Sequence, residues 1–432
     1  MLLMLENFRD LIWGIPCAIL LAVAGIYVII QTRFFSLPHV NSTQKRRNGA
    51  GMLSQLRAIS TALGGTVGIG SIIGVAYALK EGGPGSLFWM WVCALFGMAV
   101  KYAEVSLAVR YRAGTNGSVN GGAPYIFELC GKPTAARIFA LICIISSVGT
   151  GCVTQSNAVS SLALQQKFPL LPTALIFTAL TALIIFGGKR MISATDAVLI
   201  PAGSLIYILM CVFILTSCSD RLPQTLHTVF NDAFSLRAAT GGVGGSVMLC
   251  AMRVGFSKGV YSNEAGMGTS PFAHASSSSA QPHRQGVWGM FEVFFDTFIV
   301  STLTALALLC SGHGDVGSMF RSFFGTGGEL LLTAMTAVFA FAAMLSWCFY
   351  AECCLGFLHA GTLNRWMYRL AFVAAVFIGC LVPAEPVWII SDLLNAAMLF
   401  PNTLLLFSSN DNILKNYKGV ANEQHVTNTR AA

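Results

Sequence analysis

Charged residues are scarce in this chain. Asp, Glu, Lys and Arg make up 10% of its 432 residues, whereas 55% of the residues are hydrophobic. A soluble domain carries about 25% charged residues, so this composition excludes an ordinary soluble globular protein. Apolar runs long enough to cross a bilayer recur along the whole chain, and we therefore predict an all-α, polytopic membrane protein.

The sequence also lacks the motifs of common enzymes and metal proteins. Its 13 cysteines lie mostly within apolar runs and show no metal-ligand spacing, so we interpret them as small apolar residues. No Ser-His-Asp set, HExxH motif or phosphate-binding loop stands in a convincing context, and Gly68-Ile69-Gly70 lacks the strand that a dinucleotide site needs. We expect neither an enzyme nor a bound cofactor.

Hydropathy predicts eleven membrane spans, at residues 11–31, 57–80, 84–111, 135–162, 170–187, 192–216, 237–263, 285–310, 328–358, 364–382 and 386–408. Of the 26 Lys and Arg residues, 18 fall in connections on one side, among which we count Lys258. The positive-inside rule places that side in the cytoplasm. We expect a multi-pass protein of the plasma membrane (a bacterial inner membrane), with its amino terminus outside and its carboxyl terminus in the cytoplasm. The net charge of +8 is then a topology signal and not a nucleic-acid surface.

Two spans, the second and the seventh, are unusually rich in glycine. Residues 61–74 read TALGGTVGIGSIIG, and the seventh span begins TGGVGGSVMLCAMRVG. The two starts are five spans apart, which makes the second set an inverted copy of the first and indicates an inverted-repeat transporter. Helices broken by glycine free backbone groups that must line a cavity or meet a ligand. Close packing of GxxxG pairs is the alternative explanation for the second span taken alone.

This repeat divides the chain into four parts. They are an extra amino-terminal helix with a basic cytoplasmic loop (1–56), a first five-helix repeat (57–216), a second, inverted five-helix repeat (217–408) and a polar cytoplasmic tail (409–432).

Ionisable residues inside membrane spans are candidates for function because their burial is costly. Within or beside the predicted spans we single out Lys101, Glu104, Arg253, Lys258, Glu264, Glu292 and Asp296. Lys101 and Glu104 are three residues apart and are expected to pair on one helix face. A structural network that ties Arg253 or Lys258 to Glu264 or Glu292 is the alternative to a functional role.

Several long stretches resemble one known family. ALGGTVGIGSIIGVAYALKEGGPGSLFWMWVCALFGMAVKYAEVSLAVRYR (62–112) and GFSKGVYSNEAGMGTSPFAHA (255–275) closely resemble the signatures of the alanine or glycine:cation symporters, also called sodium:alanine symporters. Further matches lie at 152–157, 291–306 and 346–352. The resemblance implies a five-plus-five inverted repeat after one extra helix, as in the neurotransmitter:sodium symporter superfamily. It also implies sodium-driven import of a small neutral amino acid such as alanine or glycine.

The resemblance further implies where the ligands bind. Backbone carbonyls of Gly64 and Val67 are expected to hold sodium. The expected substrate-binding residues are Gly65, Thr66, Gly68, Gly70, Ser71, Gln155, Val243, Gly244, Val247 and Trp347. Taken without the family, Gln155 is equally well a hydrogen-bonding residue of the bundle and Trp347 a core residue.

The chain departs from the family pattern at three places. Ser71 stands where members usually have Asn, and Ala342-Ala343 stands where they usually have a Ser-Thr pair. Ser346 replaces a usual glycine one turn from Ala342, and its hydroxyl is expected to compensate in part. These differences leave open which amino acid is carried and whether sodium or protons drive transport. Glu104, Glu292 and Asp296 are the candidates for proton coupling, and a membrane sensor that moves no amino acid is the alternative outside transport.

Overall fold

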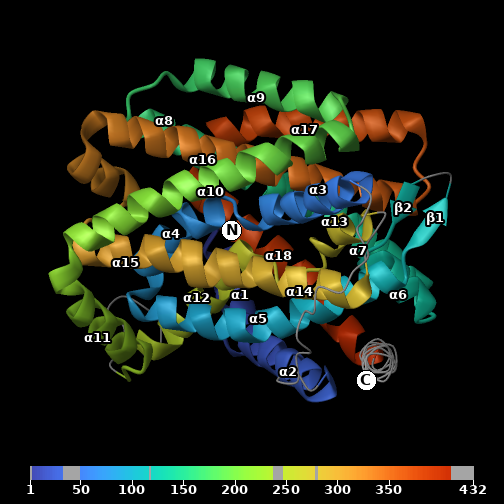
Figure 1. Ribbon diagram of the computed structural model, residues 1–432, viewed down its shortest axis with the longest axis horizontal. Coiled ribbons are helices and arrows are strands. Elements are labelled where there is room, and N and C mark those ends of the chain that lie inside the picture. Colours follow the sequence, from blue (N-terminus) through green and yellow to red (C-terminus); the bar gives the residue numbers. More distant parts are fainter. Residues whose placement is uncertain (1, 33–48, 116–117, 237–246, 278–280, 410–432) are drawn as a thin grey trace.

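The structure is a computed structural model that describes residues 2–32, 49–115, 118–236, 247–277 and 281–409. These parts are almost entirely helical, and Figure 1 shows long helices running alongside one another across the view. The exception is a two-stranded antiparallel ribbon of β1 (Ala113–Thr115) and β2 (Ser118–Asn120). The predicted all-helical class is therefore confirmed apart from this short ribbon.

The first half of the chain contains these elements: α1 (Leu2–Trp13), α2 (Ile15–Thr32), α3 (Gly49–Thr66), η2 (Ile69–Ser71), α4 (Ile73–Gly82), α5 (Gly85–Arg110), α6 (Ala123–Leu129), α7 (Pro133–Val148), η3 (Gly149–Val153), α8 (Thr154–Gln165), α9 (Leu170–Phe186) and α10 (Lys189–Ser217). Here η2 is a short 3-10 turn and η3 is a π-helical bulge between α7 and α8.

The second half contains η4 (Ser219–Arg221), α11 (Leu222–Ala233), α12 (Val247–Asn263), α13 (Pro271–Ala275), α14 (Pro282–Val293), η5 (Phe294–Ser301), α15 (Thr302–Ser311), α16 (Val316–Phe357), α17 (Thr362–Leu381) and α18 (Ala384–Ser408). The segment η5 is a second π-helical bulge, between α14 and α15. The longest helix, α16, bends at Gly325, whose φ of 66° lies in the left-handed region that favours glycine.

Seven helical segments among the described residues are long and apolar enough to cross a membrane, judged by length and composition. They coincide with seven of the eleven predicted spans. Of the other four, the second is interrupted, the fifth is α9 with 17 residues, and the seventh is described only from Val247 onward. The tenth, α17, carries Arg365 and Arg369 within its 20 residues. The number eleven, the inverted repeat and the four-part division remain predictions.

Packing around α5 and α16 determines where the polar residues meet. Helices α2, α12 and α14 all pack against α5, while α3, α8 and α10 pack against α16. The interrupted second span, α3–η2–α4, contacts both groups, since α3 packs on α16 and α10, and α4 packs on α12. The interruption itself therefore lies where the two groups of helices meet.

Candidate functional site

The second predicted span is interrupted where its glycines predict. Helix α3 ends at Thr66, and α4 begins at Ile73 after the short turn η2. In a continuous α-helix the N–H of Gly68 would donate to the carbonyl of Gly64. It donates instead to the Thr66 oxygen at 3.0 Å, so the interruption withdraws the usual donor of the Gly64 carbonyl.

Close packing explains some of the glycines. A Cβ on Gly70 would lie 2.9 Å from Cα of Ser262, and a Cβ on Gly65 would overlap the hydroxyl of Tyr350. No side chain fits at either position without moving its neighbours. Gly74 differs, because the nearest atom to its Cβ position is 3.8 Å away. Both explanations of the glycine-rich span, an opened backbone and close packing, therefore apply to the same segment.

Gln155 lies against the interruption. Its Oε1 accepts a hydrogen bond from the N–H of Ile69 at 3.4 Å, and its Nε2 donates to the hydroxyl of Tyr261 at 3.4 Å. The amide thus satisfies an N–H group that a continuous helix would have directed to Gly65. Gln155 follows the π-helical bulge η3, and such bulges are frequent at functional sites.

Asp296 is a carboxylate that forms a hydrogen bond directly with the interrupted segment. Ser71 in η2 donates to its Oδ1, and Ser262 at the end of α12 donates to its Oδ2 at 2.7 Å. Thr297 adds a third hydroxyl contact at 3.2 Å. Asp296, Ser71 and Ser262 are each fully buried, and no Lys, Arg or His of the described residues forms an ion pair with Asp296. A buried carboxylate among hydroxyls provides oxygen ligands for a positive group.

Of the three residues expected in the other wall of the site, only Val247 is described, and it lies away from the interruption. Val243 and Gly244 fall outside the described residues. Val247 begins α12, 15 residues before Ser262, which is roughly 22 Å along a helix axis. The part of α12 that meets the interruption is its carboxyl end, at Tyr261 and Ser262.

A second interruption follows directly. Residues 264–270 separate α12 from α13 and are not helical. Glu264, Gly266 and Gly268 there have φ values of 53°, 85° and 71°. Sequence reasoning placed the interruption at residues 241–245, which the structure does not describe. The Gly-Met-Gly of the motif SNEAGMG was the available signal for the break that the structure contains.

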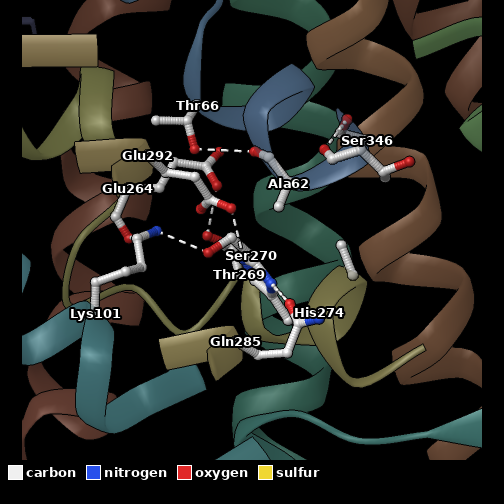
Figure 2. Close-up of polar contacts among 12 residues, drawn as sticks. Ala62, Thr66, Lys101, Glu264, Thr269, Ser270, His274, Gln285, Glu292 and Ser346 are labelled. Atoms are coloured by element: carbon white, nitrogen blue, oxygen red, sulfur yellow. Dashed lines mark hydrogen bonds and ion pairs between the residues drawn. The ribbon is translucent and has the colours of Figure 1, made fainter. Parts of the chain in front are cut away.

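Glu104 and Glu292 belong to a separate polar network around this second interruption, of which Figure 2 shows the part with Glu292. Glu292 accepts from His274 at 2.5 Å, and the other nitrogen of His274 contacts Gln285 at 2.7 Å. Lys101 donates to Ser270 at 2.8 Å and to the backbone oxygen of Glu264 at 3.1 Å.

Asn402 of α18 completes the network by bonding both Glu104 and the oxygen of Gly266. The expected Lys101–Glu104 contact is not among the hydrogen bonds or ion pairs of the described residues, since Lys101 turns to residues 264 and 270. The network ties the non-helical segment to α5, α14 and α18. Glu292 and Asp296, four residues apart in sequence, therefore serve different clusters.

Trp347 lies in α16, buried to 2% exposure. Its side chain packs against Gly151 of the bulge η3, where a Cβ would overlap it, and its ring centroid is 6.0 Å from that of Tyr350. Tyr350 in turn contacts the Gly65 position, so Trp347 is one residue removed from the interruption. Thr66 donates to the carbonyl of Ala62 and closes the last turn of α3 (Figure 2).

Lys258 was predicted to lie in a cytoplasmic connection, but the structure places it inside a helix. It lies inside α12, 2% exposed, and its ammonium is 2.8 Å from each oxygen of Asp392 in α18. The rings of Tyr77 and Trp388 lie 4.9 and 4.8 Å from the same ammonium. Arg253 pairs with Asp10. The alternative in which Arg253 or Lys258 pairs with Glu264 or Glu292 is not found among the ion pairs of the described residues, because the partners come from α1 and α18.

An apolar helix that opens in its middle, with freed backbone groups beside buried polar side chains of other helices, defines a secondary membrane transporter. Residues 2–431 match the sodium:alanine symporter family, and the chain belongs to this family. The expected family is thus confirmed. Membership makes the protein a sodium-coupled amino acid transporter of the membrane and not an enzyme.

Individual comparisons agree with this assignment. An uncharacterized transporter of Haemophilus influenzae is 35% identical over 434 residues, which cover 96% of this chain and 95% of that protein. The sodium/alanine symporter AgcS of Methanococcus maripaludis is 33% identical over 435 residues, 94% of each chain. The solved structure of a Na⁺-coupled sialic acid symporter in a substrate-bound outward-open state has a TM-score of 0.54, with 11% identity over 94% of this chain and 86% of that one. At this identity the likeness shows the fold alone.

Proposed function

We propose that this protein imports a small neutral amino acid, such as alanine or glycine, together with sodium by alternating access. The single observation that carries the proposal is the meeting of three elements at one point. The interruption at η2, the amide of Gln155 and the carboxylate of Asp296 are joined by hydrogen bonds through Ile69 and Ser71.

The opened backbone suits the two ends of an amino acid. The amino end of α4, which starts at Ile73, presents N–H groups and a positive helix dipole toward a carboxylate. Asp296, with Ser71 and Ser262, presents oxygen atoms toward a positive group, either the ammonium of the substrate or a cation. The substrate thereby lies across the interruption, in a place from which membrane lipid is excluded.

The other expected residues, apart from Val247, keep their proposed roles. Gly65, Thr66, Gly68 and Gly70 contribute backbone groups to the site. Trp347 limits the apolar side through Tyr350. Val243 and Gly244 stay part of the proposed substrate wall, whereas Val247 lies too far along α12 from Ser262 to belong to it. Gly64 and Val67 provide carbonyls to sodium.

Transport then follows from joint binding. Sodium and substrate bind between the two groups of helices, and the complex favours a rocking of one group against the other that exposes the site to the opposite side. The direction of net transport is set by the sodium gradient. No covalent step is involved.

Proton coupling is the second candidate, and the buried carboxylates favour it. Asp296, Glu104 and Glu292 are each at most 2% exposed, and one oxygen of Glu104 and one of Glu292 have no hydrogen-bond partner among the described residues. A proton that binds one of these groups would replace sodium as the driving ion.

Uptake into proteoliposomes tests the proposal. Labelled alanine, glycine and serine are offered with an inward sodium gradient, and then with potassium in place of sodium under an inward proton gradient. We expect uptake under the sodium gradient and no uptake under the proton gradient without sodium. Uptake that follows the proton gradient without sodium supports the second candidate, and a protein that moves no label under either gradient contradicts both.

A further inference from the structure

Asp196 is a buried carboxylate that the site described above does not use. It lies in α10 and is 0% exposed. Its Oδ1 has no hydrogen-bond partner among the described residues, and none of their Lys, Arg or His side chains forms an ion pair with it. A buried charge without a partner is strongly unfavourable, so this carboxyl is stable either with a proton or beside a positive group that the protein itself does not supply.

Two hydroxyl side chains, those of Thr61 and Ser346, lie beside this carboxylate, and the hydrogen bond from Ser346 comes from a shared donor. Ser346 lies 3.3 Å from Oδ2 of Asp196, but its hydroxyl also donates to the carbonyl of Thr61 at 2.7 Å. A hydroxyl has one proton, and the shorter contact takes it. Asp196 is left with little hydrogen bonding, and the lone pairs of Ser346 remain free to face a cation.

Oxygen atoms of Ser346 and Ala342 lie with Asp196 on the side of Gly64 where a side chain would be. The position that a Cβ of Gly64 would occupy lies 2.8 Å from Oγ of Ser346, 3.4 Å from Cγ of Asp196 and 3.6 Å from the backbone oxygen of Ala342. Ser346 lies on the side of Ala62 away from Glu264 and Glu292 in Figure 2, so this group of oxygens is separate from the network around the second interruption.

The interruption of the second span adds a freed ligand. The N–H of Gly68 turns to Thr66, and the Gly64 carbonyl loses its usual helical donor. Carbonyl, hydroxyl and carboxylate oxygens are the ligands that hard cations prefer. All of them lie where α3, α10 and α16 pack together.

We propose that Asp196 binds the coupling sodium ion, with Ser346 and the Gly64 carbonyl, and thereby replaces the Ser-Thr pair whose place Ala342 and Ala343 occupy. The methyl groups of these alanines offer no ligand, whereas the carboxylate of Asp196 approaches the same point from α10. The proposal rests on the proposed function, since it assigns the ion site of that transporter. One ligand of the sodium ion then comes from α10 in place of α16.

The test uses the purified full-length protein. Binding of radiolabelled sodium, the rise of Tm with sodium and sodium-driven uptake are measured for the parent, Asp196→Asn and Asp220→Asn. Asp220 is an exposed carboxylate in η4 and serves as the matched control. A fourth protein combines Asp196→Asn with Ala342→Ser and Ala343→Thr, which rebuild the hydroxyl pair.

We expect Asp196→Asn to raise the half-saturating sodium concentration about tenfold or more, because the charge of the ligand set decides affinity for a hard cation. Asp220→Asn behaves as the parent. The rebuilt hydroxyl pair returns most of the lost sodium affinity, which a merely structural role of Asp196 would not allow.

Three results overturn the proposal. Unchanged sodium dependence in Asp196→Asn, with a parent that is driven by sodium, refutes this inference and leaves the proposed function intact. A parent without sodium-driven uptake refutes the proposed function and the inference together. A variant that melts well below the parent without sodium, and that the hydroxyl pair does not rescue, assigns Asp196 a structural role.

Discussion

The carboxylate of Asp296 is hydrogen-bonded to the interrupted span. Asp296 accepts from hydroxyls of three different residues, Ser71, Ser262 and Thr297, and these come from three segments of the chain. Hydroxyl donors stabilise the ionised form of a buried carboxylate without pairing it with a positive charge. Such a charge attracts a cation or an ammonium group more strongly than it would in water.

Asp296→Asn tests this role of the charge. Asparagine keeps the shape: its oxygen still accepts from one of the two serines, and its NH2 group donates to the hydroxyl of the other, so we expect a folded protein. Its rate of amino acid uptake falls at least about 100-fold, which corresponds to about 2.7 kcal/mol. Uptake in proteoliposomes and elution in size-exclusion chromatography measure the two effects, with Asp220→Asn as the control. Uptake within threefold of the parent would show that the charge is dispensable.

At the scale of the element, the interrupted span needs glycine for close approach as well as for unwinding. Gly70 meets the backbone of α12 at Ser262, whereas Gly74, one turn later in the same GxxxG pair, meets nothing within 3.8 Å of its Cβ position. Backbone cannot move aside as a flexible side chain does. Comparing the two positions therefore distinguishes a glycine required for helix contact from a glycine that merely lies in a helix.

Gly70→Ala and Gly74→Ala form a matched pair. The first forces η2 away from α12, and overpacking of this kind costs about 1–3 kcal/mol of unfolding free energy. We expect a lower Tm and strongly reduced uptake. The second adds a methyl group at ordinary van der Waals distance from its neighbours, and Ala is favoured over Gly in a helix by about 1 kcal/mol, so Tm is unchanged or higher. Equal effects of the two substitutions would contradict the assigned contact between η2 and α12.

At the scale of the whole molecule, one buried ion pair joins the amino- and carboxyl-terminal parts of the chain. Lys258 of α12 pairs with Asp392 of α18, and the indole of Trp13 in α1 donates to the Asp392 carbonyl at 2.8 Å. The three helices thus meet at one residue. Removing one member of a buried ion pair leaves an uncompensated charge, whereas removing both does not.

A double-mutant cycle tests this junction. Lys258→Met alone is expected to cost about 3–5 kcal/mol of stability, because Asp392 stays charged and buried. Lys258→Met combined with Asp392→Leu recovers most of this loss. Thermal unfolding in detergent is measured for the parent, Lys258→Met, Asp392→Leu and the double variant. Additive losses, with the double variant the least stable, would mean that the two charges do not depend on each other.

The sequence predicts this fold better than it predicts the site. Apolar runs predict the helices, and glycines predict the opening at η2, because both signals are local. Asp296 was found by the cost of a charge within a span. Ser262 was missed because a serine in a motif carries no local mark of its partners. Asp196 lies within the sixth predicted span and was overlooked although it carries the same signal as Asp296, a charge within a span. Only packing brings Ser262 to Ser71 and Asp196 to Ser346.

The orientation in the membrane is the remaining property of the whole molecule that the sequence predicts. Eleven spans place the two ends of the chain on opposite sides, and the basic residues place the carboxyl end in the cytoplasm. Green fluorescent protein fused after Ala432 is expected to fluoresce, because it folds in the cytoplasm. Alkaline phosphatase fused after Ser235, in the connection between the sixth and seventh predicted spans, is expected to be active outside. The reciprocal fusions are the controls and should be silent. Two fusions that report the same side would refute the alternation on which the prediction rests, because six and eleven crossings differ by an odd number.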